Sequence, residues 1–160
     1  MEQKVTVGNV CFIQDRRNGR VLLLERSRDP MKNKSTGVGG KTHFEEDIHS
    51  SCIREVKEET GLDVKSVQLK GVLKTILEGS RSSWLLFAYT ADYAGGDLID
   101  CSEGELYWEN VKGIDLKENT IGFIRKILPK VLQDGGFIEG TIIHDIRGNV
   151  LREELKTYGF

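Results

Sequence analysis

Apolar and polar residues alternate along several short stretches of the chain, and this pattern predicts a protein rich in β-strands. Residues 5–13 and 20–25 are rich in Val, Ile and Leu, and the Asn18-Gly19 pair between them is typical of a tight hairpin turn. We expect the polar residues 27–36 to form a loop, followed by a short glycine-rich segment at 37–41. Further strands are expected at residues 64–77, 83–93, 105–111, 137–145 and 149–155.

Two segments have helical patterns. The first covers residues 47–60, where Asp47 is a suitable N-cap and Gly61 a suitable left-handed stop. The second covers residues 119–132, where apolar residues recur with the helical period and Pro129 lies near the end. Because the helices interrupt the strands at irregular positions, the pattern favours the α+β or mixed α/β class over a regular βαβ array.

Composition narrows the class of protein. A length of 160 residues predicts one domain, residues 1–160, and hydrophobic and charged fractions of 38% and 30% are ordinary for a globular chain. The formal net charge of −2 argues against a protein that coats nucleic acid. No apolar run approaches the roughly 20 residues of a membrane span, and residues 1–4 lead directly into a strand, so we expect a cytoplasmic protein. The three cysteines have no zinc spacing and are expected to be buried thiols; they are Cys11, Cys52 and Cys101.

The first predicted helix carries three acidic residues on one side. At about 100° per residue, Glu55, Glu58 and Glu59 fall within one arc about 100° wide. Their mutual repulsion disfavours this arrangement unless a cation lies among them, and hard divalent ions take oxygen ligands of this kind. A charged helix face is also normal for a solvated helix, so the helix alone does not decide between the two interpretations. The apolar side chains of the neighbouring arc are expected to pack on a sheet; they are Cys52, Ile53 and Val56.

The residues around this helix carry a specific motif. The segment from Gly40 to Leu62 matches the Nudix box, G-x5-E-x7-R-E-U-x-E-E-x-G-U, in which U is a bulky aliphatic residue. Nine defined positions across 23 residues are filled without a gap, so the chain resembles the Nudix hydrolase family. The matching residues are Gly40, Glu46, Arg54, Glu55, Val56, Glu58, Glu59, Gly61 and Leu62.

The resemblance implies both a fold and a chemistry. The fold is an α/β/α sandwich around a mixed β-sheet, with the box as a loop-helix-loop and with a C-terminal helix plus hairpin. The chemistry is hydrolysis of nucleoside diphosphates linked to another moiety, in the presence of Mg²⁺ or Mn²⁺. A metal ion lowers the pKa of the attacking water and neutralises charge on the transferring group.

The resemblance also implies roles for individual residues. The metal ligands would be Glu55, Glu58, Glu59 and the carbonyl of Gly39. Arg54 would orient the carboxylates, and Glu46 would support the loop and helix through Arg54. Lys41, next to Gly40 in the glycine-rich segment, would contact phosphate.

A second acidic segment resembles the late loop that many relatives use. Glu103 would be a further metal ligand or the general base, and Glu105 is the alternative. The proton acceptor from water is therefore either Glu55 or a residue of this later loop. An exposed loop acid with no role is the alternative for both Glu103 and Glu105.

Parts of the chain outside the box resemble bacterial MutT/MutX-type 8-oxo-dGTP diphosphatases, which yield a monophosphate and pyrophosphate. The segments that carry this resemblance are residues 37–41 and 96–104. Three positions depart from the usual pattern: Ser35 replaces a Trp, His43 replaces a Glu, and Glu45 replaces a Gly. We expect Ser35 and His43 to lie near the nucleotide.

Base recognition is less clearly marked. The amide of Asn119, at the start of the second helix, can donate to and accept from a purine edge, but it can equally cap that helix. Arg26 ends a strand facing the glycine-rich segment, where it can reach base or phosphate or remain an exposed arginine. The aromatic residues of the strand at 83–93 are expected in the core; they are Trp84, Phe87 and Tyr89.

These observations support a Mg²⁺-dependent enzyme that hydrolyses oxidised purine dNTPs for nucleotide-pool sanitation. Alternatives are a Nudix pyrophosphatase for a nucleotide sugar, a dinucleoside polyphosphate or an RNA cap, and a non-catalytic nucleotide-binding regulator. The complete acidic set argues against a regulator. We expect a small-molecule nucleotide as partner, no stable nucleic-acid binding, no membrane, and a monomer or homodimer.

Overall fold

The computed structural model describes residues 2–159, which form nine strands, two α-helices and one 3₁₀ helix. The strands are β1 (Lys4–Asp15), β2 (Arg20–Arg26), β3 (Ser35–Thr36), β4 (Val38–Lys41), β5 (Asp63–Leu77), β6 (Ser82–Gly95), β7 (Gly104–Asn110), β8 (Phe137–His144) and β9 (Val150–Tyr158). The helices are α1 (Ile48–Thr60), η1 (Ile114–Leu116) and α2 (Gly122–Val131).

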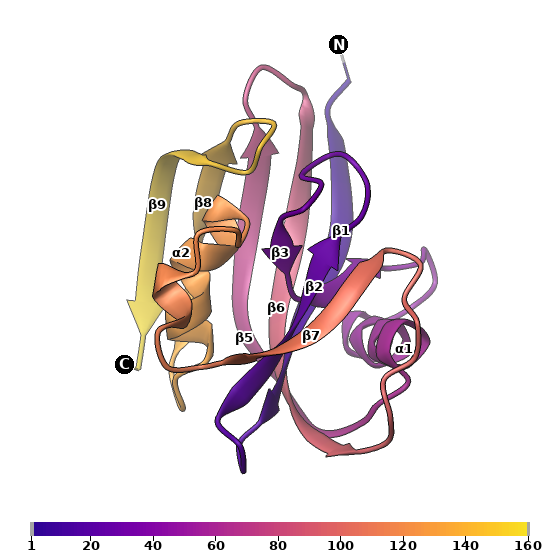
Figure 1. Cartoon of the computed structure of the whole chain (residues 1–160). Helices are drawn as coiled ribbons and strands as arrows, with labels where there is room; N and C mark the ends of the chain where they lie inside the picture. Colours follow the sequence, from indigo (N-terminus) through magenta and orange to yellow (C-terminus); the bar gives the residue numbers. More distant parts are fainter. Residues whose placement is uncertain (1, 160) are drawn as a thin grey trace.

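The strands form one mixed sheet (Figure 1). Its order is β3-β2-β1-β6-β5-β8-β9, with β4 paired to β1 and β7 paired to β2. The β1/β6 and β5/β8 pairs are parallel, and the other pairs are antiparallel. The sheet brings the late hairpin β8–β9 beside β5, so the C-terminal segment becomes one edge of the structure.

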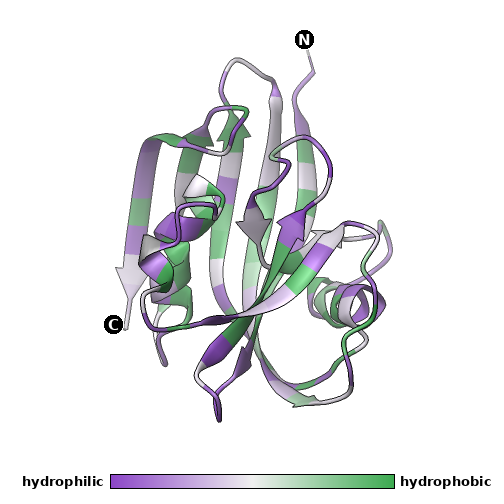
Figure 2. Ribbon diagram, in the orientation of Figure 1, coloured by the Kyte–Doolittle hydropathy of each residue, from purple (hydrophilic) through white to green (hydrophobic). Residues whose placement is uncertain are grey.

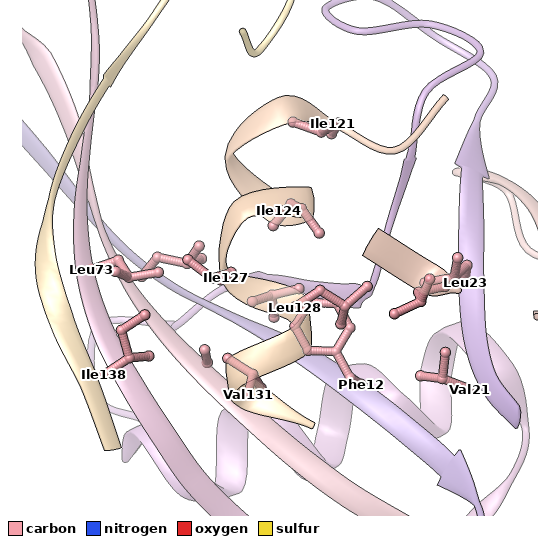
Figure 3. Close-up of a cluster of buried hydrophobic side chains, with 14 of the residues drawn as sticks. Phe12, Val21, Leu23, Leu73, Ile121, Ile124, Ile127, Leu128, Val131 and Ile138 are labelled. Carbon is pink, nitrogen blue, oxygen red and sulfur yellow. The ribbon is translucent and has the colours of Figure 1, made fainter. Parts of the chain in front are cut away.

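The alternation of side chains along the strands gives each face its own helix. On β1, Val10 and Phe12 pack in the cluster that contains α2, whereas Cys11 and Ile13 pack in the cluster that contains α1. Figure 3 shows the α2 cluster, and Figure 2 shows hydrophobic and hydrophilic bands alternating along the central strands. The layers are helix, sheet and helix, which confirms the expected α+β class and sandwich.

Helix α1 begins and ends where its local sequence predicts. The side chain of Asp47 accepts a hydrogen bond from the backbone N–H of Ser50, as an N-cap does. Gly61 has a left-handed φ of 73°, and its N–H donates to the carbonyl of Lys57.

Three local expectations are wrong. The glycine-rich residues 38–41, which are not among the expected strands, form strand β4 against β1. The second helix begins at Gly122, so Asn119 lies before it and does not cap it. Ile53 is 42% exposed, because the buried side of α1 is centred on Cys52 and Val56 and Ile53 lies about 100° away from Cys52.

Two further observations concern the cysteines and the expected absence of a membrane span. Cys11 and Cys52 are buried free thiols, as expected, and Cys101 is half-buried. Neither helix in the described part of the chain has the length and apolar character that crossing a bilayer requires.

The packing predicts that replacing two different phenylalanines has very different effects on the free energy of unfolding. Phe12 is fully buried and Phe44 is fully exposed. Phe12→Ala is expected to lower the free energy of unfolding by about 3–5 kcal/mol, because it removes apolar contacts and leaves a cavity. Phe44→Ala is the matched control and should change it by less than about 0.5 kcal/mol. Urea denaturation of both variants measures the difference, and equal effects would contradict this placement of Phe12.

Candidate active site

Two glycines of β4 bring the backbone close to the acidic helix. Gly39 has a φ of +153°, and a Cβ there would lie 2.0 Å from the carbonyl oxygen of Asn9 on β1, so no other residue fits. A Cβ on Gly40 would lie 2.8 Å from Oε1 of Glu55. The carboxylate of Glu55 therefore lies directly against the backbone of β4.

Arg54 connects the loop before α1 to the carboxylates of the helix. Its Nε and Nη2 donate to Oε2 and Oε1 of Glu46 at 2.6 and 2.9 Å, which is a bidentate pair. Its Nη1 donates to both Glu55 Oε1 and Glu58 Oε2 at 3.1 Å. Its Nη2 also donates to the carbonyl of Lys41 at 3.3 Å.

Glu59 is the most deeply buried carboxylate of the helix. It is 8% exposed, and its Oε2 is buried without a hydrogen-bond partner. Burial, followed by the hydrogen bond and the negative charge of Glu55, raises the pKa of Glu59 to about 9. A backbone hydrogen bond from Gly39 opposes this shift, and the charge of Glu103 adds to it.

These properties fit a bound divalent cation. A cation near Glu59 would supply the partner that Oε2 lacks and would favour the ionised carboxylate. Within residues 2–159, no three His, Cys, Asp or Glu side chains form a ready-made metal site. The donor set therefore fits an ion that shares its ligands with substrate phosphates and backbone carbonyls, as Mg²⁺ usually does.

Two cavities meet at the carboxylates. The larger has a volume of about 740 Å³ and the smaller about 260 Å³. Glu55, Glu59 and Glu103 line both cavities, and Glu58 lines the smaller one. Glu105 lines neither, so the structure brings Glu103 rather than Glu105 to the cluster. Asp100, which the motif does not include, also lines the smaller cavity.

Glu103 has a basic neighbour. Its Oε1 lies 3.5 Å from Nη2 of Arg28, and its carbonyl accepts hydrogen bonds from the N–H and the hydroxyl of Ser27. These contacts attach the loop between β6 and β7 to the end of β2. A loop glutamate 41 residues beyond Leu62, the last residue of the box, thereby reaches the carboxylates of α1.

The larger cavity extends away from the carboxylates over the α2 face of the sheet. Near strand β4, which we call the glycine strand because it contains Gly39 and Gly40, the cavity is lined by Lys41, His43 and Arg26. Nε of Arg26 donates to the carbonyl of Pro30 at 2.9 Å, which holds the side chain along the loop between β2 and β3. The rest of the lining includes Met31, Thr75, Leu77, Trp84, Phe123, His144 and Ile146.

Two candidate residues lie outside this cavity. Asn119 is not among its lining residues, and its carbonyl accepts from the N–H of Ser35 at 2.8 Å. Ser35 is fully buried, with Oγ 2.6 Å from the hydroxyl of Tyr107, and it does not line the cavity either. The expectations that Asn119 contacts the base and that Ser35 lies near the nucleotide have no support in this geometry, because both residues hold β3 in place.

The sequence missed three residues of the cavity wall. Trp84 was expected in the core, yet it lines the cavity from β6. Phe123 and His144 come from α2 and β8. His144, which follows two isoleucines at the end of β8, was a usable signal, but only strand pairing shows what it faces.

Comparison with known proteins agrees with this fold and site. Residues 4–131 match the NUDIX domain. The uncharacterized Nudix hydrolase YvcI of Bacillus subtilis is 32% identical over 138 residues, which are 84% of this chain and 84% of that protein. The NAD-capped RNA hydrolase NudC of Vibrio atlanticus is 32% identical over 129 residues, which are 72% of this chain and 46% of that protein. The crystal structure of a MutT protein from Bacillus halodurans has a TM-score of 0.82 and 28% identity, covering 94% of this chain and 97% of that one.

The chain therefore belongs to the Nudix family. It is a Nudix-type pyrophosphatase that resembles MutT proteins in structure. Nudix hydrolases generally need divalent metal ions, which agrees with the unpartnered oxygen of Glu59.

The Glu46–Arg54 pair predicts that part of the free energy of unfolding is lost at acid pH. The guanidinium of Arg54 lowers the pKa of Glu46 from an ordinary 4.5 to about 2. A carboxylate with a depressed folded-state pKa stabilises the fold above pH 4.5, and this contribution is lost as the pH falls from 4.5 towards 2. Glu46→Gln should therefore flatten the fall in the free energy of unfolding over that window. Denaturation at pH 6 and pH 3 measures it; Glu45→Gln, at an exposed neighbour, should retain the wild-type slope.

Proposed function

We propose that this protein is a Mg²⁺-dependent nucleotide pyrophosphatase that converts oxidised purine deoxynucleoside triphosphates to monophosphates and pyrophosphate. It would thereby remove damaged nucleotides from the pool in the cytoplasm. The proposal takes residues 1–160 as one catalytic unit, because the described strands join in a single sheet. Likeness to a MutT protein over 94% of the chain supports the assignment.

One observation carries the proposal. Three carboxylates, Glu55, Glu59 and Glu103, line both a small acidic cavity and the end of a cavity of about 740 Å³. The larger volume lies in the range of pockets that enclose a small-molecule ligand. A ligand with its phosphates at the carboxylates can therefore place the rest of its structure over the α2 face.

The proposed metal ligands are Glu55, Glu58, Glu59, Glu103 and the carbonyl of Gly39. When bound there, Mg²⁺ would lower the pKa of a water and neutralise charge on the phosphoryl group. Arg54 holds Glu55 and Glu58 at 3.1 Å from one nitrogen, so their oxygens are already gathered. This arrangement reduces the reorganisation that ligand binding would otherwise require.

Basic residues on the cavity wall would bind the phosphates. Lys41 lies on β4 immediately after Gly39 and Gly40, and Arg26 lies on β2 at the same cavity. His43 also lines this part, where the usual motif has a carboxylate. Lys41 and Arg26 place positive charge on the wall of the cavity that Glu55, Glu59 and Glu103 also line, so phosphate oxygens would have cationic partners there.

The proton of the attacking water needs an acceptor. Glu55 and Glu103 are the candidates, because both line the two cavities while Glu58 lines only the smaller. Glu59 is less suited, because it is 8% exposed and its unpartnered Oε2 would be a ligand of the cation.

A second candidate substrate is the nucleotide cap of an RNA. Its support is the 32% identity to an NAD-capped RNA hydrolase over 72% of this chain. Hydrolysis of a dinucleotide linkage uses the same carboxylates, so the substrate is decided by the larger cavity. Nucleotide sugars and dinucleoside polyphosphates are further alternative substrates, and the larger cavity would decide among them in the same way.

A substrate panel tests the assignment. With Mg²⁺ present, 8-oxo-dGTP should give the highest kcat/KM among 8-oxo-dGTP, the ordinary dNTPs, ADP-ribose, a nucleotide sugar and NAD-capped RNA. The products from 8-oxo-dGTP should be the monophosphate and pyrophosphate. A higher kcat/KM for ADP-ribose or capped RNA would overturn the sanitation function while leaving the family chemistry intact.

Removal of one carboxylate should separate catalysis from folding. Glu58 is largely exposed, so Glu58→Gln is expected to leave the thermal midpoint nearly unchanged. It should lower kcat by about 100-fold or more, because several kcal/mol of metal-assisted stabilisation are at stake. Steady-state kinetics over a Mg²⁺ titration measures this. Glu45→Gln is the control, because Glu45 is an exposed acid in the turn before α1. Unchanged turnover in Glu58→Gln would remove Glu58 from the metal site.

A further inference from the structure

The far end of the larger cavity is built by a hairpin that lies beyond the NUDIX match. The match ends at residue 131, whereas β8 and β9 cover residues 137–158. Strand β8 pairs in parallel with β5, with Ile142 opposite Thr75 and His144 opposite Leu77. His144 and Ile146 therefore reach the cavity from outside the matched region.

This end of the cavity is rich in rings. The indole of Trp84 lies over β1 at Gly8, where a Cβ would be 2.4 Å from the ring. Phe123, at the start of α2, lies with its ring centroid 4.8 Å from that of His144, and the planes are tilted by 38°. Flat aromatic faces such as these stack on heterocyclic bases. The chemistry of the wall therefore fits a planar ring at this end.

His144 adds one oriented polar atom to the apolar wall. The residue is 7% exposed, and its Nδ1 lies 2.7 Å from the carbonyl oxygen of Asp145. A carbonyl only accepts, so Nδ1 carries the proton. In the neutral ring, Nε2 is then the acceptor.

The hairpin turn is held against α2, so this wall is formed before a ligand binds. The carbonyl of Gly148 accepts from the N–H of Phe123 at 3.1 Å. The carboxylate of Asp145 accepts from the N–H groups of Arg147 and Asn149, both at 2.9 Å. His144 and Phe123 are thus positioned by the same turn.

We propose that this end of the cavity, between Trp84, Phe123 and His144, binds the base of the substrate, and that His144 determines base specificity. The inference rests on the proposed function and adds the residue that selects the base. Guanine presents N7 as an acceptor, whereas its 8-oxo form carries a hydrogen on N7. A neutral His144 accepts from that N–H and has no donor for the unmodified N7.

Three variants test this inference. His144→Leu removes the acceptor, His144→Gln restores an acceptor at a similar reach, and Leu151→Ala changes an exposed residue of the same hairpin. The ratio of kcat/KM for 8-oxo-dGTP over dGTP should fall roughly tenfold in His144→Leu, mainly through KM, because one hydrogen bond is lost. His144→Gln should recover part of it, and Leu151→Ala should match the wild type.

Binding of the reaction products, measured without metal ions, provides a second test of base discrimination. Calorimetry with the products 8-oxo-dGMP and dGMP should show the same loss of discrimination in His144→Leu. If that variant fails to fold by circular dichroism, Phe123→Leu provides the second test, with weaker binding of both products than in the wild type. If His144→Leu still distinguished 8-oxo-dGMP from dGMP as the wild type does, or if Phe123→Leu bound both products as tightly as the wild type, this inference would be overturned and the proposed function would not. Failure of the wild type to hydrolyse any dNTP would instead overturn the proposed function.

Discussion

The contacts of a single guanidinium hold the acidic site together. Arg54 bonds bidentately to Glu46, at 2.6 and 2.9 Å, and also contacts Glu55 and Glu58. Without these contacts, carboxylates on adjacent turns of α1 would repel one another and turn towards solvent. The same side chain bonds to the carbonyl of Lys41, so the helix carboxylates and the glycine strand keep one arrangement. Burial, followed by the hydrogen bond and the negative charge of Glu55, raises the pKa of Glu59 on the same helix to about 9.

The sheet then separates the acidic cluster from most of the larger cavity. Its α1 side supports the carboxylates, and its α2 side supports most of the larger cavity. Strand β4 connects the two, because Gly39 and Gly40 pack against β1 on one side and against Glu55 on the other. A side chain at Gly39 would collide with the backbone of β1 at Asn9, and a side chain at Gly40 would displace the carboxylate of Glu55.

The two parts of the site also come from different regions of the chain. The acidic cluster comes mainly from residues 40–62, a continuous segment with a recognisable pattern. The cavity is assembled from β2, β4, β5, β6, α2 and β8, and its far wall includes His144 from a hairpin beyond the family match. Proteins that share the matched segment can therefore differ in the part of the cavity wall that lies beyond it.

The sequence by itself determined the features that depend on short-range contacts. Asp47 and Gly61 mark the ends of α1 through hydrogen bonds within a few residues, and the box identified the family from local spacing. Tertiary structure decided the rest. The start of α2 follows from the bond between Phe123 and the distant Gly148, and Asn119 is used to hold β3 instead of capping the helix. The burial of one helix side, the role of the glycine strand and the composition of the cavity wall all depend on strand pairs far apart in sequence, which local patterns do not specify.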